Sequence, residues 1–184
     1  MTGGPTGGDR YDRGLAILRQ VAGSDQPAVL DVLTAAAPAL GRYLVEFVYG
    51  EVYAGPALTL RRRELAAVAA LAALGNAEPQ LRFHLQGALN TGCTQAEVDE
   101  VIAGAGDTLD PIDREIAAVA ALTAAGTPTR AELCRHVHRL LDAGGTPAEV
   151  VETILLMVAF AGFPAALNGV AAAAQVFAER SLPG

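Results

Sequence analysis

The chain carries the same helical pattern twice, and this repeat limits what it can fold into. Residues 63–75 match residues 114–126 at 10 of 13 positions, and each block is an Arg-Glu pair, an alanine-rich run and a glycine. Residues 84–98 then align with residues 136–150 at 7 of 15 positions, from a histidine to an Ala-Glu-Val sequence. A repeat of this size is a supersecondary unit that buries its apolar face against its copy. We therefore predict that the two Arg-Glu helices pack against each other.

Helix start and stop signals occur throughout, and no segment has a clear strand pattern. Capping boxes begin at Thr94, Thr129 and Thr146, each with a glutamate three residues later. Glycines such as Gly75 and Gly126 follow apolar-periodic runs, where helices commonly end. The predicted helices cover residues 9–22, 28–35, 38–53, 60–75, 79–91, 95–105, 111–125, 130–143, 147–161 and 164–180. We predict an all-α fold.

The repeat also sets the expected domain organisation. Residues 1–8, rich in glycine, threonine and proline, are predicted to be a tail without signal-peptide character. A single helical domain is expected over residues 9–180. Repeat one occupies about residues 38–106 of this domain, and repeat two occupies about residues 111–180.

Composition agrees with close-packed helices and excludes several functions. Hydrophobic residues make up 52% of the chain and aromatic residues only 5%, and the abundant alanine is the best helix former. The net charge is −7, which excludes a duplex nucleic-acid binder because such a protein needs a surplus of cations. Two cysteines make neither a disulfide framework nor a four-ligand zinc site. We expect a reducing cytoplasm.

A long uncharged segment precedes the C-terminus. Residues 153–178 contain no charged side chain, which is long enough to span a bilayer. Gly162, Pro164 and Asn168 interrupt this segment, so we predict two helices that turn at residues 162–164 and no membrane partner. Because so large an apolar surface usually marks an interface, we expect a homo-oligomer.

A series of short motifs resembles the carboxymuconolactone decarboxylase family, an all-helical group that also includes the alkylhydroperoxidase D proteins. The motifs are Tyr11–Leu15, Gly50–Tyr53, Arg61–Leu65, Leu81–His84, Asn90–Gly92, Thr94–Val98 and Ile154–Asn168. The resemblance implies an alkylhydroperoxidase D-like helical fold with two partial internal repeats. Repeat one lacks the closing Ala-Gly-x-Pro-Ala-Ala segment, and repeat two lacks the Gly-Glu-Val-Tyr helix. Because family members are commonly hexamers, a trimer of this two-repeat chain is favoured, and a hexamer is the alternative.

The peroxidase branch of this family uses a Cys-x-x-Cys pair whose second cysteine lies four residues before the histidine. The corresponding positions are Ala77 and Gln80 before one histidine, and Thr129 and Glu132 before the other. Peroxide reduction requires two thiols that close a disulfide. The sequence therefore favours the decarboxylase type, and a lone cysteine such as Cys134 is interpreted as a packed side chain.

The resemblance makes His84 the candidate proton donor, because decarboxylase-type members use a histidine here and imidazole titrates near neutral pH. Glu51 is expected either to orient and charge this histidine or to handle a second proton. One of the arginines 61–63 would hold a substrate carboxylate, with Arg61 and Arg63 as the candidates. The expected pocket is lined by apolar residues of the 147–168 hairpin and by Tyr49, Tyr53 and Phe83.

Secondary candidates lie in the Arg-Glu helices and in repeat two. His136 aligns with His84 and either forms a second site or supports the first. Glu64 and Glu115 lie in strongly apolar helices, and pairing with arginine is favoured over catalysis for both. His136 and His138 are two residues apart and face different sides of a helix, which argues against a shared metal. No metal site is predicted.

Three functions remain open. The first is an enzyme like γ-carboxymuconolactone decarboxylase in aromatic catabolism, which needs no cofactor because the conjugated lactone accepts the electrons itself. The second is a decarboxylase, isomerase or cyclase of natural-product biosynthesis that uses the same acid–base chemistry on another ring. The third is a non-catalytic oligomeric binding protein.

Overall fold

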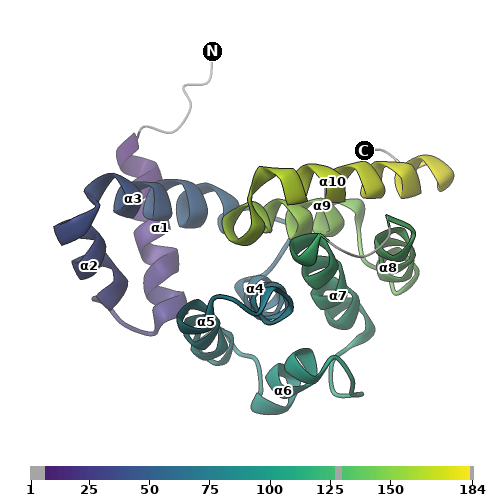
Figure 1. Ribbon diagram of the computed structural model, residues 1–184, viewed down its shortest axis with the longest axis horizontal. Coiled ribbons are helices and arrows are strands. Elements are labelled where there is room, and N and C mark those ends of the chain that lie inside the picture. The colour runs from purple at the N-terminus through teal and green to yellow at the C-terminus, as the bar shows by residue number, and fades with distance from the viewer. Residues whose placement is uncertain (1–6, 127–129, 183–184) are drawn as a thin grey trace. The chain divides into compact units, whose positions relative to one another are not determined.

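The computed structural model describes residues 7–126 and 130–182, and within these ranges it is all-α (Figure 1), which confirms the predicted fold class. The chain divides into two compact units, one ending at Pro56 and the other beginning at Ala57. The first unit contains α1 (Gly7–Ala22), α2 (Ala28–Ala36), α3 (Pro38–Tyr43) and the π-helix η1 (Leu44–Val52). The second unit contains α4 (Leu60–Leu74), α5 (Glu78–Asn90), α6 (Gln95–Ala103), α7 (Pro111–Ala125), α8 (Arg130–Asp142), α9 (Pro147–Leu156) and α10 (Val158–Glu179).

Two glycines allow α1 and η1 to pack closely in the first unit. A Cβ atom added to Gly14 would lie 2.0 Å from the carbonyl oxygen of Val45, and one added to Gly50 would lie 2.5 Å from that of Arg10. Residues 44–52 form a π-helix, where the sequence predicted an α-helix over 38–53. Apolar periodicity over nine residues does not distinguish the two hydrogen-bonding patterns, so this difference was not visible in the sequence.

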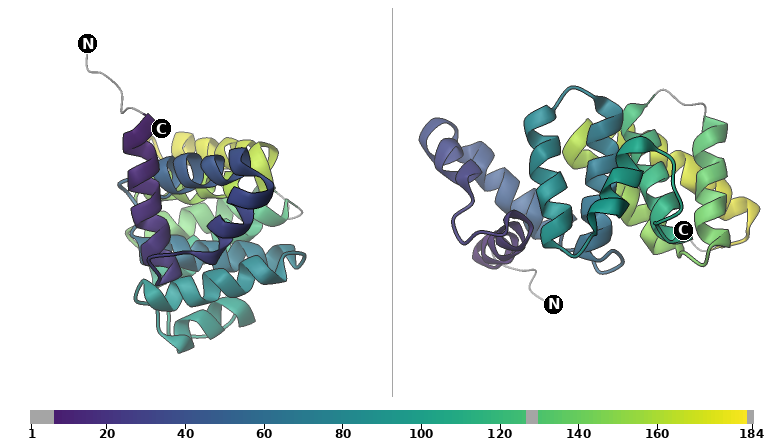
Figure 2. Two further views of the ribbon diagram at one scale, coloured as in Figure 1. Left: turned by 90° about the vertical axis from the view of Figure 1, so that its left-hand side faces the viewer. Right: turned by 90° about the horizontal axis from the view of Figure 1, so that it is seen from below.

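In the second unit α4 and α7 lie side by side (Figures 1 and 2), which confirms the predicted packing of the two Arg-Glu helices. Their buried contact surfaces consist largely of alanine, which lets helix axes approach closely. These buried alanines are Ala66, Ala67, Ala69 and Ala70 on α4 and Ala117, Ala120 and Ala124 on α7. Both helices end at the predicted glycines, Gly75 and Gly126, whose φ angles of 65° and 64° are left-handed.

The uncharged segment forms the predicted hairpin, made of α9 and α10. Gly162, with φ 78° and ψ 173°, breaks the helix just before Pro164. A Cβ atom added to Gly169 would lie 2.8 Å from Cγ2 of Ile154, so α10 returns along α9. By length and composition α10 could cross a membrane. Because α10 is broken at Gly162 and packs on α7, α8 and α9, we assign it to the helical core.

The capping boxes that begin at Thr94 and Thr146 are both formed. The one expected at Thr129 lies outside the described residues, as do residues 1–6 of the expected tail. Residues 7 and 8, also assigned to that tail, belong to α1.

One glutamate of α9 holds the start of α4. The Glu152 carboxylate accepts hydrogen bonds from the backbone N–H groups of Ala57 and Leu58, both at 2.9 Å, and forms an ion pair with Arg63. Arg63 is fully buried. Repeat two therefore fixes the beginning of the Arg-Glu helix of repeat one.

The same arrangement recurs with the repeats exchanged. Glu100 of α6 accepts hydrogen bonds from the backbone N–H groups of Thr108, at 2.6 Å, and Leu109, at 2.9 Å, and from Arg114 at 3.0 Å. Thus repeat one fixes the beginning of α7. Each repeat supplies the carboxylate that the other requires, which joins α4–α6 to α7–α9 within the second unit.

We expect Glu152→Ala to lower the free energy of unfolding by about 3 kcal/mol, because it takes the carboxylate from buried Arg63 and the acceptor from two backbone N–H groups. Glu78→Ala is the control, since Glu78 forms an exposed pair with Arg82 and its loss should cost about 0.5 kcal/mol or less. Urea denaturation measures both variants. Equal costs for the two substitutions would contradict a structural role for Glu152.

Candidate active site

Each Arg-Glu helix presents its glutamate to a histidine of the following helix. Glu64 Oε2 on α4 lies 2.8 Å from His84 Nδ1 on α5. Glu115 Oε2 on α7 lies 2.6 Å from His136 Nδ1 on α8. The sequence favoured arginine as the partner of both glutamates, and that prediction was wrong. The neighbouring arginine turns toward the carboxylate of the other repeat, so the glutamate faces the adjacent helix.

These pairs have the chemistry of an oriented acid–base group. When the glutamate is ionised, the imidazole Nδ1–H donates to it, and Nε2 becomes the atom that exchanges a proton with a bound molecule. An acid or base must be held in place before it can transfer a proton in a transition state. In repeat one, the second carboxylate oxygen of Glu64 is buried and has no hydrogen-bond partner among the described residues.

The pair in repeat one is closed off by aromatic rings. The side chains of His84 and Glu64 are 8% and 0% exposed. The rings of Phe83 and Phe160 meet the imidazole edge-on, with centroids 5.1 and 5.2 Å from its own. Phe83 was predicted as a lining residue, and Phe160 belongs to the apolar hairpin expected near this histidine.

The pair in repeat two opens onto a cavity. His136 and Glu115 line a space of about 650 Å³ between α4, α6, α7 and α8, which we call the repeat-two cavity. Alanines of α4 and α7 form much of its wall, and its charged residues are Glu100, Arg114, Glu115 and Arg139 together with the titratable His136. The side chains of His136 and Glu115 are 18% and 14% exposed. A small molecule therefore has room beside this imidazole.

The missing closing segment of repeat one explains why this cavity exists. After α6 the chain continues with the small residues 104–106, Gly-Ala-Gly, which line the cavity. The aligned residues after α9, 156–158, are Leu-Met-Val, and Phe160 follows them onto the other histidine. A Cβ atom added to Gly106 would lie 2.6 Å from Cγ of Glu100, so this loop also lies against α6.

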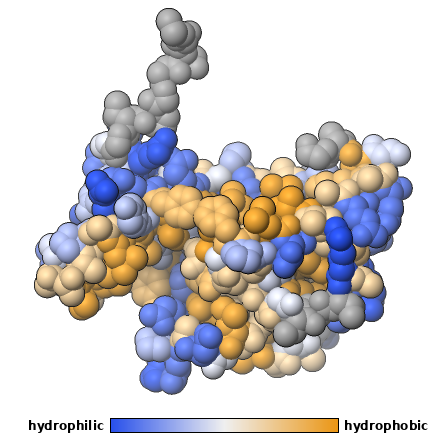
Figure 3. Space-filling view, turned by 45° about the horizontal axis from the view of Figure 1, so that its top comes forward, coloured by the Kyte–Doolittle hydropathy of each residue, from blue (hydrophilic) through white to orange (hydrophobic). Residues whose placement is uncertain are grey.

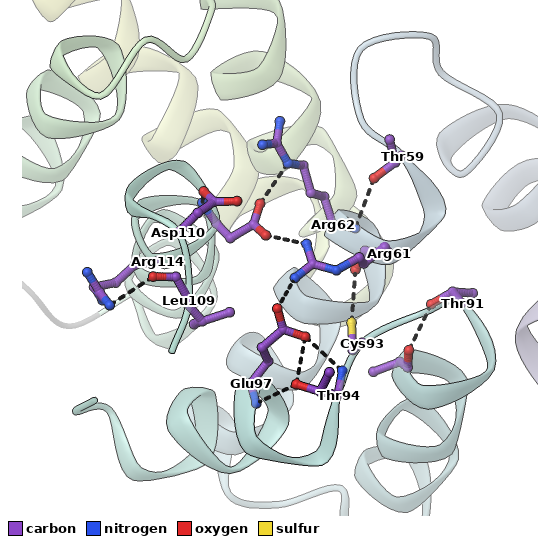
Figure 4. A network of polar contacts seen from close by, with 12 residues as sticks. Thr59, Arg61, Arg62, Thr91, Cys93, Thr94, Glu97, Leu109, Asp110 and Arg114 are labelled. Carbon is purple, nitrogen blue, oxygen red and sulfur yellow. Dashed lines mark hydrogen bonds and ion pairs between the residues drawn. The ribbon is translucent and has the colours of Figure 1, made fainter. Parts of the chain in front are cut away.

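The arginine run at the start of α4 is committed to protein carboxylates. Arg61 pairs with Asp113 and Glu97, and Arg62 pairs with Asp113 at 2.7 Å (Figure 4). Arg62 also pairs with Glu149. Arg63, the third arginine, is held by α9 as described above. None of the three is an isolated surface charge. Substrate binding by Arg61 or Arg63 stays a prediction, and it would require exchange of a protein carboxylate for the substrate.

The remaining predicted site residues belong to the first unit. Glu51 forms ion pairs with Arg10 at 2.7 Å and with Arg13 at 3.4 Å. Tyr49 and Tyr53 are buried, and their ring centroids are 4.8 Å apart. The carboxylate that contacts Nδ1 of His84 comes from Glu64 on α4. The expected role of Glu51 in orienting this histidine stays a prediction.

Both cysteines are buried and free. Burial raises the pKa of the Cys93 thiol to about 12 and also raises that of Cys134. Cys134 Sγ lies 3.6 Å from the carbonyl oxygen of Ala172, on α10. A protonated, packed thiol is a poor nucleophile, so these environments agree with the interpretation of Cys134 as a packed side chain.

The fold and this site define a two-repeat all-α protein with a histidine–glutamate pair in each repeat. The model of the carboxymuconolactone decarboxylase family matches residues 38–108 and again residues 103–175. The chain belongs to the carboxymuconolactone decarboxylase family, as its motifs suggested. A comparison with curated proteins finds no match to this sequence.

The ion network around α4 predicts acid sensitivity. A hydrogen bond of 2.7 Å from the backbone N–H of Thr94 lowers the pKa of Glu97 below its ordinary 4.5. Hydrogen bonds from the Thr94 hydroxyl and from Arg61 lower this pKa further. Together they outweigh burial, which raises it. Because the folded-state pKa is the lower one, ionised Glu97 stabilises the protein above pH 4.5, and this stabilisation is lost as the pH falls through the folded value.

We therefore expect Glu97→Gln to lower the free energy of unfolding at neutral pH. The difference in free energy of unfolding between this variant and the wild type should shrink as the pH is reduced toward about 3. Urea denaturation across this range measures the effect. Ala96→Gly, at an exposed position of the same helix, is the control, and its difference in free energy of unfolding from the wild type should not depend on pH. A constant deficit for Glu97→Gln at every pH would refute the linkage.

Proposed function

We propose that this protein is a cofactor-free acid–base enzyme that acts on a small cyclic carboxylate or lactone, as a carboxy-lyase of the carboxymuconolactone decarboxylase type. The observation that supports this proposal most is the hydrogen-bonded His136–Glu115 pair beside the repeat-two cavity. Membership of the family and the absence of a Cys-x-x-Cys pair in the sequence also support it.

The reaction places two demands on such a site. As the bond to carbon dioxide breaks, its electron pair moves into the conjugated lactone and forms a dienolate, and the carbon then takes up a proton. Nε2 of a protonated histidine supplies that proton, and the imidazole is recharged from solvent. The paired glutamate holds the ring in one orientation. The alanine walls offer an apolar surface to the ring of the substrate.

His84 and His136 each have the paired glutamate that this chemistry needs. We place the reaction at His136, because it lines a cavity large enough for a small ring. His84, favoured by the sequence, is the second candidate, and access to it would require movement of Phe160. The two proposals make opposite predictions for matched substitutions.

We expect His136→Gln to lower kcat/KM for γ-carboxymuconolactone by about 10²–10⁴-fold, the typical contribution of a general acid. Release of carbon dioxide and loss of lactone absorbance measure turnover. His84→Gln is the matched control and should retain activity, with circular dichroism to verify folding of both variants. Loss of activity in His84→Gln alone would move the reaction to repeat one. Full activity in both variants would exclude histidine acid catalysis.

We also propose that the chain assembles into a homo-oligomer through the outer face of the α9–α10 hairpin. Figure 3 shows hydrophobic residues along this part of the surface. Its exposed apolar residues are Val151, Leu155, Phe163, Leu167 and Val170, of which Phe163 and Leu167 are 60% and 65% exposed. Exposed apolar surface of this kind usually marks an interface. With two repeats in each chain, a trimer is favoured over a hexamer, and we propose a cytoplasmic location.

Light scattering on the full chain should give about three times the chain mass of 18.8 kDa. Leu167→Asp should shift the population toward monomer, because it buries a charge in the proposed interface. Arg82→Asp, at an exposed position of α5 outside the proposed interface residues, should leave the mass unchanged. A monomeric wild type at micromolar concentration would rule out this assembly.

A further inference from the structure

Arg139 lines the repeat-two cavity and carries a charge that no described side chain neutralises. The Glu100 carboxylate in the cavity accepts hydrogen bonds from two backbone N–H groups and from Arg114. The Glu115 carboxylate is hydrogen-bonded to His136. Arg139 lines the same cavity and is exposed, and its side chain has no hydrogen bond or ion pair within the described part of the chain. Its charge is therefore available to a bound molecule.

The position of Arg139 on α8 relates it to the proposed acid. Residues three apart on a helix lie on the same face, so Arg139 and His136 face the cavity together, as their shared lining of it shows. Repeat one has Gly87 at the aligned position. The guanidinium is thus present only beside the open histidine–glutamate pair, where a ligand has room, and is absent from the closed one.

We infer that Arg139 binds a carboxylate that is retained, rather than lost, by the molecule that enters the repeat-two cavity, and so determines a preference for anionic substrates. This inference rests on the proposed function, which places the reaction in the same cavity. A guanidinium binds a carboxylate through two parallel N–H···O bonds, which fix the direction of the ligand as well as its charge. A ring held in this way projects over the alanine walls toward the imidazole. Arg139 takes the role that the sequence assigned to Arg61 or Arg63.

Binding of benzoate and of benzamide, which differ in charge and little in shape, tests this inference without turnover. Calorimetry on the full chain should show that the wild type binds benzoate at least tenfold more tightly than benzamide. Arg139→Gln should remove this preference by weakening benzoate alone. Arg135→Gln is the matched control, because Arg135 is on the same helix, is paired with Glu132 and does not line the cavity. Arg135→Gln should bind both molecules as the wild type does.

Equal binding of benzoate by Arg139→Gln and the wild type, or equal binding of benzoate and benzamide by the wild type, would overturn the inference. Turnover separates it from the proposed function. If benzoate binding depends on Arg139 but the wild type releases no carbon dioxide from the lactone, the inference holds and the proposed function fails. If the wild type turns over and Arg139→Gln keeps its KM, the reaction stands and the role of Arg139 fails.

Discussion

The fold depends on buried charges in each repeat that pair with charges of the other repeat. Fully buried Arg63 meets Glu152 of repeat two, and fully buried Asp113 of repeat two meets Arg61 and Arg62. A charge withdrawn from water without a partner is strongly destabilising. Neither repeat is therefore electrostatically complete without its copy. The alanine surfaces of α4 and α7 supply packing, and these ion pairs set how the two surfaces align.

The same requirement creates the candidate site. Because the arginine of each Arg-Glu pair is drawn to a carboxylate across the repeat boundary, the adjacent glutamate remains for the histidine of the next helix. Glu64–His84 and Glu115–His136 follow from the same local sequence. Their surroundings differ, since Phe160 covers the first imidazole and a cavity adjoins the second. Identical pairs thus have different access to a ligand.

The sequence predicted the helices, the packing of α4 on α7 and the turn at Gly162, because the repeat, the capping boxes and the glycine stops are local signals. It misassigned the partners of Glu64 and Glu115, since counting charges does not show which way a side chain turns. A signal was nevertheless present: the glutamate precedes the histidine by 20 residues in one repeat and by 21 in the other. The cavity was not predictable, because its walls come from four helices distant in sequence.

The loop between α6 and α7 has a consequence for how this fold diversifies. Pockets are commonly reshaped by exchange of one side chain for another. Here the volume of the repeat-two cavity comes from the absence of the closing segment after α6 in repeat one. The loop is anchored at its far end, where Thr108 and Leu109 donate to Glu100. Insertions between α6 and that anchor would fill or reshape the space while α4, α7 and their ion pairs stay in place. Selection can therefore alter which ligands fit by changing loop length, at little cost to the helices that carry the acid–base pair.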